Sequence, residues 1–255
     1  MMRNQIKTEV EIANIRQSGE ILATILKKAA AATKPGVSAL EIDQLCRKEL
    51  KKHGATAAFL NYAPDSAPFP ATICISINDE IVHGIPTADK VIQSGDLVGL
   101  DFGVNYSGMI TDSAVTIAVG KVPDNAKRLL KYTQRALDAA IDVIKPGVQV
   151  GDIGSTVEKV FEAGNIAAIY AMCGHGVGHE VHEDPVIPNY GTAGTGVHLQ
   201  EGMTVAIEPI ASLGTHDGYV ADDGWTFVTQ DGSLSAQFEH TILITKGGAE
   251  VLTAW

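Results

Sequence analysis

The sequence has few cysteines, and they form no recognisable pair. Cys46, Cys74 and Cys173 are the only three in 255 residues, and no two of them stand in a CxxC arrangement. An odd, scattered set argues against a disulfide framework and against a cysteine-type zinc site. It favours a reducing, cytoplasmic setting.

Long hydrophobic runs are missing as well. No run reaches the roughly 18 residues that a membrane helix needs, and the N-terminal stretch MMRNQIKTEVEI has no apolar segment typical of an export signal. We therefore expect a protein without a membrane partner. Hydrophobic residues still make up 45% of the chain, which is enough for a sizeable core.

Positive charge is absent from two long parts of the chain. No Lys or Arg lies between Lys159 and Lys246, an interval with eleven Asp or Glu residues, and Lys90 is the only basic residue between Lys52 and Lys121. The formal net charge of −11 argues against nucleic acid or an anionic membrane as the main partner. Acidic side chains in these two intervals have almost no cationic neighbour in the sequence.

Four amphipathic helices are expected, arranged in two pairs. Hydrophobic periodicity predicts them over residues 8–33, 38–53, 124–145 and 152–163. The first two begin with capping boxes, formed by Thr8 with Glu11 and by Ser38 with Glu41, and Gly54 ends the second.

The two helix pairs indicate an internal repeat. The tetrapeptide KPGV separates the helices of each pair, at residues 34–37 and again at 145–148. Helix, turn, helix and strands therefore recur in one order. We interpret residues 1–255 as a single domain of two similar α/β halves, about 8–120 and 121–250, with a functional site at their seam.

Residues 98–117, VGLDFGVNYSGMITDSAVTI, are predicted to form a β-hairpin whose turn is centred between Tyr106 and Ser107. Asp101 and Asp112 are equidistant from that centre, so in this register they face each other. Their Cβ atoms would lie roughly 4.5–5.5 Å apart. Two buried carboxylates so placed are tolerable if they share a proton, meet a basic side chain or bind a metal ion.

The second half of the chain adds further polar groups in apolar surroundings. The stretch GHGVGHEVHEDP holds His175, His179 and His182, while Glu208 lies in TVAIEPI and Glu239 in QFEHTILIT. Taken singly, each has a plain structural interpretation. A strand glutamate usually faces water or an ion-pair partner, and a loop histidine is usually a hydrogen-bonded structural residue.

The missing cations decide between the three ways of accommodating the carboxylates. Basic residues are nearly absent around Asp101, Asp112, Glu208 and Glu239, and a shared proton would serve only one pair. Metal is the economical answer, and two ions rather than one. Four carboxylates with one imidazole suit Mn(II), Fe(II) or Co(II), with Zn(II) also possible. Two such ions about 3.5–4 Å apart form a known hydrolytic site.

Five motifs, in a fixed order over most of residues 72–245, resemble those of type I methionine aminopeptidases of the short bacterial form. They are ISINDEIVHGIP (75–86), LDFGVNYSGMITDSAVT (100–116), GHGVGHEVHEDPVIPNYGT (174–192), MTVAIEPI (203–210) and DGWTFVTQDGSLSAQFEHTILIT (223–245). The resemblance implies an α+β pita-bread fold, in which two pseudo-symmetric halves form a central antiparallel sheet covered by helices.

The resemblance, and not the spacing, implies roles for individual residues. The ligands of two divalent metal ions would be Asp101, Asp112, His175, Glu208 and Glu239, with Asp112 and Glu239 in the bridging places. His83 and His182 would contact the substrate at the scissile bond, and Glu208 would help to activate the attacking water. Such an enzyme removes the initiator methionine from nascent chains whose second residue is small.

The methionine pocket is also implied by the resemblance. Phe69, Cys74 and Trp225 match positions that line it, and a soft thioether suits such walls. Plain core packing is the alternative for Phe69 and Trp225. Ser66 and Val181 stand where the family carries larger side chains, which predicts a wider pocket with a relaxed preference for methionine.

Two alternative functions stay open. An Xaa-Pro peptidase of the same fold would use the same five ligands, although such enzymes usually carry an additional N-terminal domain. A metal-free pita-bread protein could act as a binding module, although such proteins have typically lost ligands. The expected partners are the N-termini of nascent polypeptides, and the resemblance implies a monomer. A basic helical face is interpreted as solvated, with contact to the ribosome surface as the alternative; it consists of Arg47, Lys48, Lys51 and Lys52.

Overall fold

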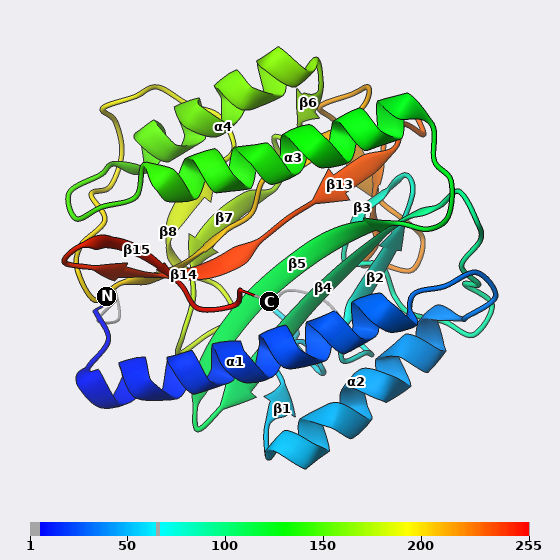
Figure 1. The fold of residues 1–255 in the computed structure, drawn as a ribbon, viewed down its shortest axis with the longest axis horizontal. Helices are drawn as coiled ribbons and strands as arrows, with labels where there is room; N and C mark the ends of the chain where they lie inside the picture. Colours follow the sequence, from blue (N-terminus) through cyan, green and yellow to red (C-terminus); the bar gives the residue numbers. More distant parts are fainter. Residues whose placement is uncertain (1–5, 65–66, 255) are drawn as a thin grey trace.

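The structure is a computed structural model, and it describes residues 6–64 and 67–254. Two pairs of helices enclose the strands (Figure 1). One side is covered by α1 (Glu9–Ala32) and α2 (Ala39–His53), and the other by α3 (Asp124–Asp142) and α4 (Val150–Gly164). Within the described ranges, no helix combines the length and the apolar character needed to cross a membrane.

The first helix pair begins and ends as the sequence predicts. The side chains of Thr8 and Ser38 each accept the backbone N–H three residues on, completing both capping boxes. Gly54 ends α2 in a left-handed conformation with φ 66°. In the second pair, α3 stops at Asp142 rather than at residue 145. The following Pro146 disfavours helical geometry just before it, which accounts for the early end.

A four-stranded antiparallel sheet packs against α1 and α2. Its strands are β1 (Thr56–Ala57), β2 (Cys74–Ile77), β4 (Leu97–Tyr106) and β5 (Met109–Ala118). β5 covers one edge of β4, while β2 and β1 pair with successive parts of the other edge. The side chains between this sheet and the two helices form one apolar core.

The register of the β4–β5 hairpin differs from the prediction. Asp101 pairs with Ala114, and Asp112 pairs with Gly103, so the two aspartates are not directly opposed. Asp112 lies two residues along β5 from the position directly opposite Asp101. Because side chains alternate with a period of two, both aspartates remain on the same face as diagonal neighbours.

The turn of the hairpin explains the error. It consists of Ser107 and Gly108 alone, with φ of 51° and 83°. Positive φ at both central residues is type I′ geometry, which matches the strand twist and favours glycine in the second position. Gly108 also donates its N–H to Asn105 Oδ1 at 3.1 Å. The prediction centred the turn one residue too early, and this moved every pair in the hairpin.

A five-stranded antiparallel sheet, in the order β15–β14–β9–β7–β8, lies toward α3 and α4 (Figure 1). Its strands are β7 (Cys173–Gly176), β8 (Glu183–Pro188), β9 (Thr204–Ile207), β14 (His240–Thr245) and β15 (Gly248–Val251). Two three-stranded sheets complete the fold. They comprise β6 (Ala167–Ala168), β10 (Ile210–Ser212) and β13 (Ser235–Gln237), and β3 (Glu80–Val82), β11 (Gly218–Val220) and β12 (Phe227–Thr229).

Strand β5 joins the two larger sheets. The backbones of Ala114 and Glu239 exchange two hydrogen bonds, of 3.3 and 2.9 Å. The backbone N–H of Asp112 donates to Thr241 Oγ1 at 2.8 Å, and the same hydroxyl donates to the Asp112 carbonyl at 2.7 Å. Residues far apart in the sequence are thereby fixed side by side, with the Asp112 strand next to the start of β14.

Candidate metal centre and active site

Asp101 and Asp112 occupy neighbouring strands and are both buried. The residues directly across the hairpin from them are the small residues Ala114 and Gly103. A side chain at 103 would also collide with the ring of Phe59, since a Cβ there would lie 2.6 Å from Cε1. The hairpin therefore presents two carboxyls on one face with little between them.

The other three predicted ligands come from the five-stranded sheet. His175 lies in β7, which pairs with β9. Glu208 follows β9 directly, and Glu239 comes directly before β14, the other neighbour of β9. Since β14 is also tied to β5, the sheet brings these three side chains to the hairpin carboxyls.

All five predicted ligands meet in one buried cluster. Asp112, His175 and Glu239 each offer a ligand atom, and these atoms lie within 4.8 Å of one another. His175 Nε2 is 3.4 Å from Glu208 Oε1. Asp101 completes the cluster through side-chain contact with Asp112.

Three oxygens in the cluster have no hydrogen-bond partner. They are Asp101 Oδ1, Asp112 Oδ1 and Glu239 Oε1, each fully shielded from solvent. A buried, unpaired carboxylate oxygen costs several kcal/mol by rough estimate, unless a cation meets it. Oxygen donors of this kind are what hard divalent metal ions bind. The residues therefore fit a metal centre.

The electrostatics of the carboxyls point the same way. Burial raises the pKa of Asp101 to about 7. Burial, together with repulsion between the neighbouring carboxylates, raises the pKa of the other three carboxyls well above their ordinary values; these belong to Asp112, Glu208 and Glu239. No Lys or Arg occurs among the described residues that line the adjoining cavity. A bound cation would stabilise the ionised forms and reverse these shifts.

The histidines around the cluster are neutral. Burial lowers the pKa of His175 to about 3 and of His83 to about 4, and it also lowers the pKa of His182. His175 Nδ1 is 2.9 Å from the Gly176 carbonyl, which can only accept, so Nδ1 carries the proton. The lone pair of Nε2 is then free for a metal ion, a tautomer often fixed in this way.

The cluster lies at a cavity of about 590 Å³, whose lining includes His83 and His182. The ring of His182 stands edge-on to that of His175, with centroids 4.5 Å apart. His83 has a φ of 60°, which is costly for a residue other than glycine and concentrates at functional sites. Both histidines are placed to reach a molecule bound beside the cluster.

One wall of this cavity is apolar and includes two of the three residues predicted to line the methionine pocket, whereas the third, Trp225, is not among the described residues that line the cavity. Phe69, Cys74 and Val181 line it, and all three are buried. Trp225 packs edge-on against Phe69 with ring centroids 5.3 Å apart, and its Nε1 donates to the Ala67 carbonyl at 3.0 Å. The remaining member of the predicted pocket, Ser66, lies outside the described residues.

Two residues at the site were not predicted. The amide of Gln237 lies 3.4 Å from Glu208 Oε2 and 3.3 Å from Glu239 Oε2. Side chains two residues apart on a strand lie on the same side. The sequence could therefore have placed Gln237 beside Glu239. Tyr62, whose hydroxyl is 2.7 Å from His182 Nδ1, gave no local signal because it lies in an irregular loop.

Comparison with known proteins gives consistent matches over the whole chain. Metallopeptidase family M24 matches residues 13–246. A methionine aminopeptidase of Aquifex aeolicus is 43% identical, and the match covers 99% of each chain. A methionine aminopeptidase of Mycoplasma capricolum is 44% identical, and the match covers 97% of each chain.

Solved structures agree with these matches. The crystal structure of a methionine aminopeptidase from Thermotoga maritima is similar to this chain with a TM-score of 0.95, at 43% identity over the full length of both. A prolidase from Pyrococcus furiosus has a TM-score of 0.77 at 26% identity, and this chain covers 65% of it. The α+β pita-bread fold predicted from the motifs is confirmed.

Proposed function

This chain belongs to metallopeptidase family M24, and from that premise we propose that it is a methionine aminopeptidase that removes the initiator methionine from nascent proteins with a small second residue. The observation that carries the proposal is the buried cluster of carboxyls with unpaired oxygens beside an apolar cavity. The full-length relatives named methionine aminopeptidase support the same substrate.

The proposed metal ligands are Asp101, Asp112, His175, Glu208 and Glu239. The family resemblance, and not the geometry, assigns Asp112 and Glu239 to the places shared by two divalent ions; both have an unpaired oxygen and offer a ligand atom within the 4.8 Å group. When bound, such ions act as Lewis acids and lower the pKa of a water molecule, which makes it a nucleophile at neutral pH. Candidate ions are Mn(II), Fe(II), Co(II) and Zn(II).

His182 and His83 act as hydrogen-bond donors to the reacting peptide in this proposal. Both are neutral because burial lowers their pKa, so each ring has one N–H to donate. The Tyr62 hydroxyl can donate to His182 Nδ1 and so keep the proton on Nε2. A donor aimed at the oxygen and nitrogen of the scissile bond stabilises the charge that develops during attack.

Glu208 is proposed to move the proton. Its Oε1 lies 3.4 Å from His175 Nε2 among the other proposed ligands, and a bound cation would keep its carboxylate ionised and able to accept a proton. Glu208 would take the proton that the attacking water loses and return it to the leaving nitrogen. The apolar wall with Phe69, Cys74 and Val181 would hold the methionine side chain, and soft sulfur suits such a surface.

A peptide panel tests the substrate assignment. The protein loaded with Mn(II) or Co(II) is expected to cleave Met-Ala-Ser, to cleave Met-Phe-Ser much more slowly, and to leave Ala-Pro-Ser intact. Preference for Ala-Pro-Ser would instead identify an Xaa-Pro peptidase. Inactivity on every peptide with every ion would point to a binding module.

The proposal includes a monomer that works in the cytoplasm on nascent chain ends. Contact with the ribosome surface would involve the basic face of α2. That face is partly neutralised within the chain, because Arg47 pairs with Asp43 at 2.7 Å and Lys52 also pairs with Glu49. Co-sedimentation with ribosomes, compared between the parent and a Lys48→Glu, Lys51→Glu variant, tests that contact. Equal co-sedimentation of the two would remove this face from the proposal.

A further inference from the structure

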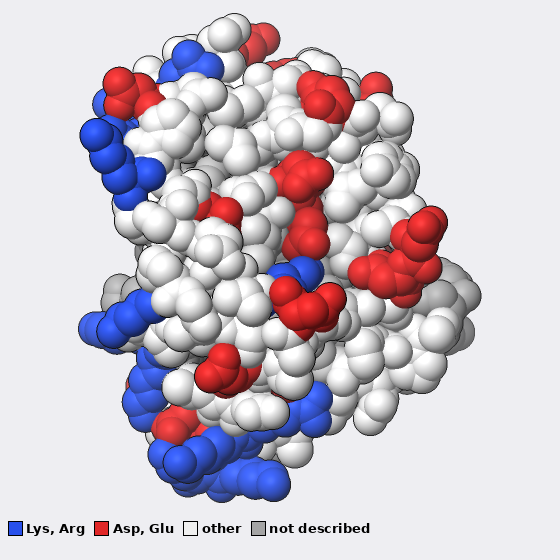
Figure 2. Space-filling view, turned by 90° about the vertical axis from the view of Figure 1, so that its right-hand side faces the viewer, with Lys and Arg blue, Asp and Glu red and all other residues white. Residues whose placement is uncertain are grey.

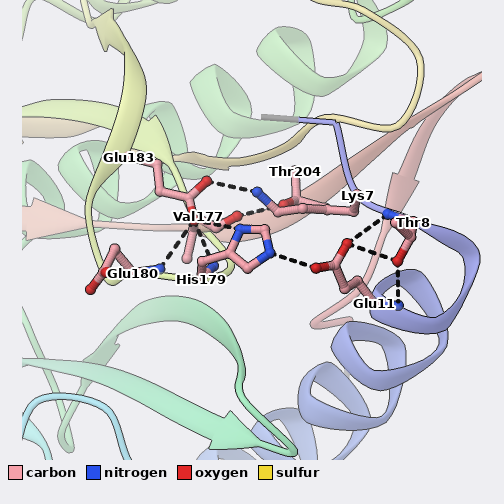
Figure 3. A network of polar contacts seen from close by, with 8 residues as sticks. All are labelled: Lys7, Thr8, Glu11, Val177, His179, Glu180, Glu183 and Thr204. Carbon is pink, nitrogen blue, oxygen red and sulfur yellow. Dashed lines mark hydrogen bonds and ion pairs between the residues drawn. The ribbon is translucent and has the colours of Figure 1, made fainter. Parts of the chain in front are cut away.

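The loop between β7 and β8, residues 177–182, is fastened to the start of the chain (Figure 3). It carries His182 into the cavity and leads directly into Glu183, the first residue of β8. Figure 3 shows side chains from the segment before α1 and from the first turn of α1 pointing toward this loop. The contacts between the two segments are polar and partly buried.

Lys7 makes the central contact. Its side chain is fully buried, and its Nζ is 2.7 Å from Glu183 Oε2. The backbone of the same residue donates to the Gly202 carbonyl at 2.8 Å, which holds it beside the start of β9. Gly178 makes room for it, since a Cβ there would lie 2.4 Å from Lys7 Cε.

Glu183 uses its second oxygen to hold the loop. Oε1 accepts the backbone N–H of His179 at 2.5 Å and that of Glu180 at 3.1 Å. One carboxylate therefore binds a buried ammonium group and two consecutive amides of the loop. Hydrogen bonds to a charged acceptor are the stronger kind, and they fix direction as well as distance.

A second contact joins the loop to the first turn of α1. His179 Nε2 is 2.7 Å from Glu11 Oε1, and the other oxygen of Glu11 accepts the N–H of Thr8 in the capping box of α1. The hydrogen bond from His179 is the main reason that the pKa of Glu11 falls to about 2. The start of α1 and the loop are thus joined at two points, one of them deeply buried.

The charge distribution makes Lys7 hard to replace. No Lys or Arg lies between Lys159 and Lys246, so the sequence around Glu183 supplies no cation. A carboxylate left unpaired at this depth would be driven to move toward water or to take up a proton. Either change would release the two amides of the loop immediately before His182.

We propose that the buried Lys7–Glu183 ion pair positions His182 in the active site, which makes the segment before α1 a working part of the catalytic unit. This inference rests on the proposed aminopeptidase function. Lys7 is a positioning residue, since it acts on the loop through Glu183, which itself also lines the cavity. Small displacements of a group at the scissile bond are costly, with about 10²-fold lost for 1 Å.

Steady-state kinetics on Met-Ala-Ser with the metal-loaded full-length protein form the first arm of the test. Lys7→Met is expected to lower kcat by about tenfold or more, with KM changed less than about twofold. Glu183→Gln is expected to do the same. The double variant removes both charges and keeps an amide oxygen for the two loop N–H groups, so its kcat should exceed that of either single variant.

Arg16→Met is the matched control. Arg16 also ties α1 to a distant strand, through Glu250 at 2.8 Å, but this pair is exposed and joins α1 to β15 rather than to the loop. Its kcat should stay within about twofold of the parent. Melting temperatures of all variants, measured at assay conditions, show whether each protein is folded during the assay.

Hydrogen–deuterium exchange of the metal-free proteins forms the second arm and needs no activity. Lys7→Met should speed exchange in residues 177–184 and leave β14 and β15 unchanged. A Lys7→Met protein with parental kcat, a change in KM alone, or unaltered exchange in residues 177–184 would overturn the proposal. If the parent cleaves no methionyl peptide, the proposed function fails and the exchange result alone decides whether Lys7 holds the loop.

Discussion

Asp112 is the residue whose surroundings argue most directly for a metal ion. It is buried beside Asp101, one of its oxygens has no partner, and both burial and the neighbouring charge raise its pKa. Natural proteins rarely bury such a group without compensation. A cation that binds several of these oxygens at once removes both the desolvation cost and the repulsion.

The Asp112→Asn substitution should therefore have opposite effects on function and on stability. The amide keeps the size but loses the charge, so affinity for Mn(II) should fall by about 10²-fold, of the order seen when coordination is disturbed. The metal-free variant should be more stable than the metal-free parent at pH 8, by about 1 kcal/mol or more. Calorimetric titration and urea unfolding measure the two quantities. Parental metal affinity in the variant would contradict the ligand assignment.

Val181 is the residue that bears on substrate selectivity. It lines the cavity together with Phe69. The family resemblance leads us to expect a larger side chain than valine at position 181. A hydrophobic pocket distinguishes side chains that differ by one methylene by only about 10–200-fold. We expect Leu-Ala-Ser to be cleaved measurably, and Val181→Phe to increase the preference for Met-Ala-Ser over Leu-Ala-Ser. Strict selectivity for methionine in the parent would refute the wider pocket.

At the scale of elements, local signals in the sequence predicted the ends of helices correctly, but the register of strand pairing was not predicted correctly. The capping boxes at Thr8 and Ser38 and the stop at Gly54 depend on neighbouring residues only, and the structure has all three. The hairpin itself was predicted correctly. The predicted register was wrong because register depends on the turn type, and the prediction did not place Gly108 at the second position of a type I′ turn.

The candidate site shows the same division. The five proposed ligands and the two histidines could be named from the family resemblance of the motifs, and the structure brings all seven to one cavity. Contacts between distant segments could not be named, because neither Tyr62 with His182 nor Lys7 with Glu183 leaves a pattern in either stretch alone. Gln237 is intermediate, since strand alternation would have placed it beside Glu239.

The type I′ turn of the hairpin gives a prediction about stability. Gly108 has φ 83°, so Gly108→Ala should lower the free energy of unfolding by about 1 kcal/mol or more. Ser107→Asn should raise it by a few tenths of a kcal/mol, roughly, because asparagine tolerates the left-handed conformation better than serine. Urea unfolding of both variants measures the difference. Equal stability of Gly108→Ala and the parent would argue against this turn.

At the scale of the whole molecule, charge is unevenly distributed. In the view of Figure 2, most Lys and Arg lie along the left edge and at the bottom, while Asp and Glu are more frequent in the middle and on the right. The carboxyls of the cluster add to this imbalance from within, because no Lys or Arg occurs among the described residues that line the cavity beside them. In the metal-free protein, the folded structure therefore disfavours ionisation of the carboxyls in the cluster.

The stability of the metal-free protein should consequently fall as pH rises from about 7.5 to 8.5. The folded protein retains protons on carboxyls whose pKa is raised, whereas the unfolded chain has already released them. Each such proton contributes a slope of about −1.4 kcal/mol per pH unit. The buried histidines, with lowered pKa, are neutral in the folded protein but partly protonated in the unfolded chain near pH 6.5, so they oppose this slope at lower pH and cease to do so above about pH 7.5.

Thermal unfolding across this range, with and without Mn(II), measures the effect. The Mn(II)-loaded protein should show no such fall, because metal binding is favoured by the ionised carboxylates and strengthens as pH rises. A metal-free protein whose stability is flat between about pH 7.5 and 8.5 would mean that the carboxyls are ionised without help.

The most direct test of a metal-dependent aminopeptidase is the turnover of Met-Ala-Ser by chelator-stripped protein titrated with Mn(II), Co(II) and Fe(II). We predict no turnover in the stripped protein, saturable activation by at least one ion, and none for Asp112→Asn at the same ion concentrations. Full activity after stripping, unchanged activity of Asp112→Asn, or inactivity with all three ions would contradict the assignment.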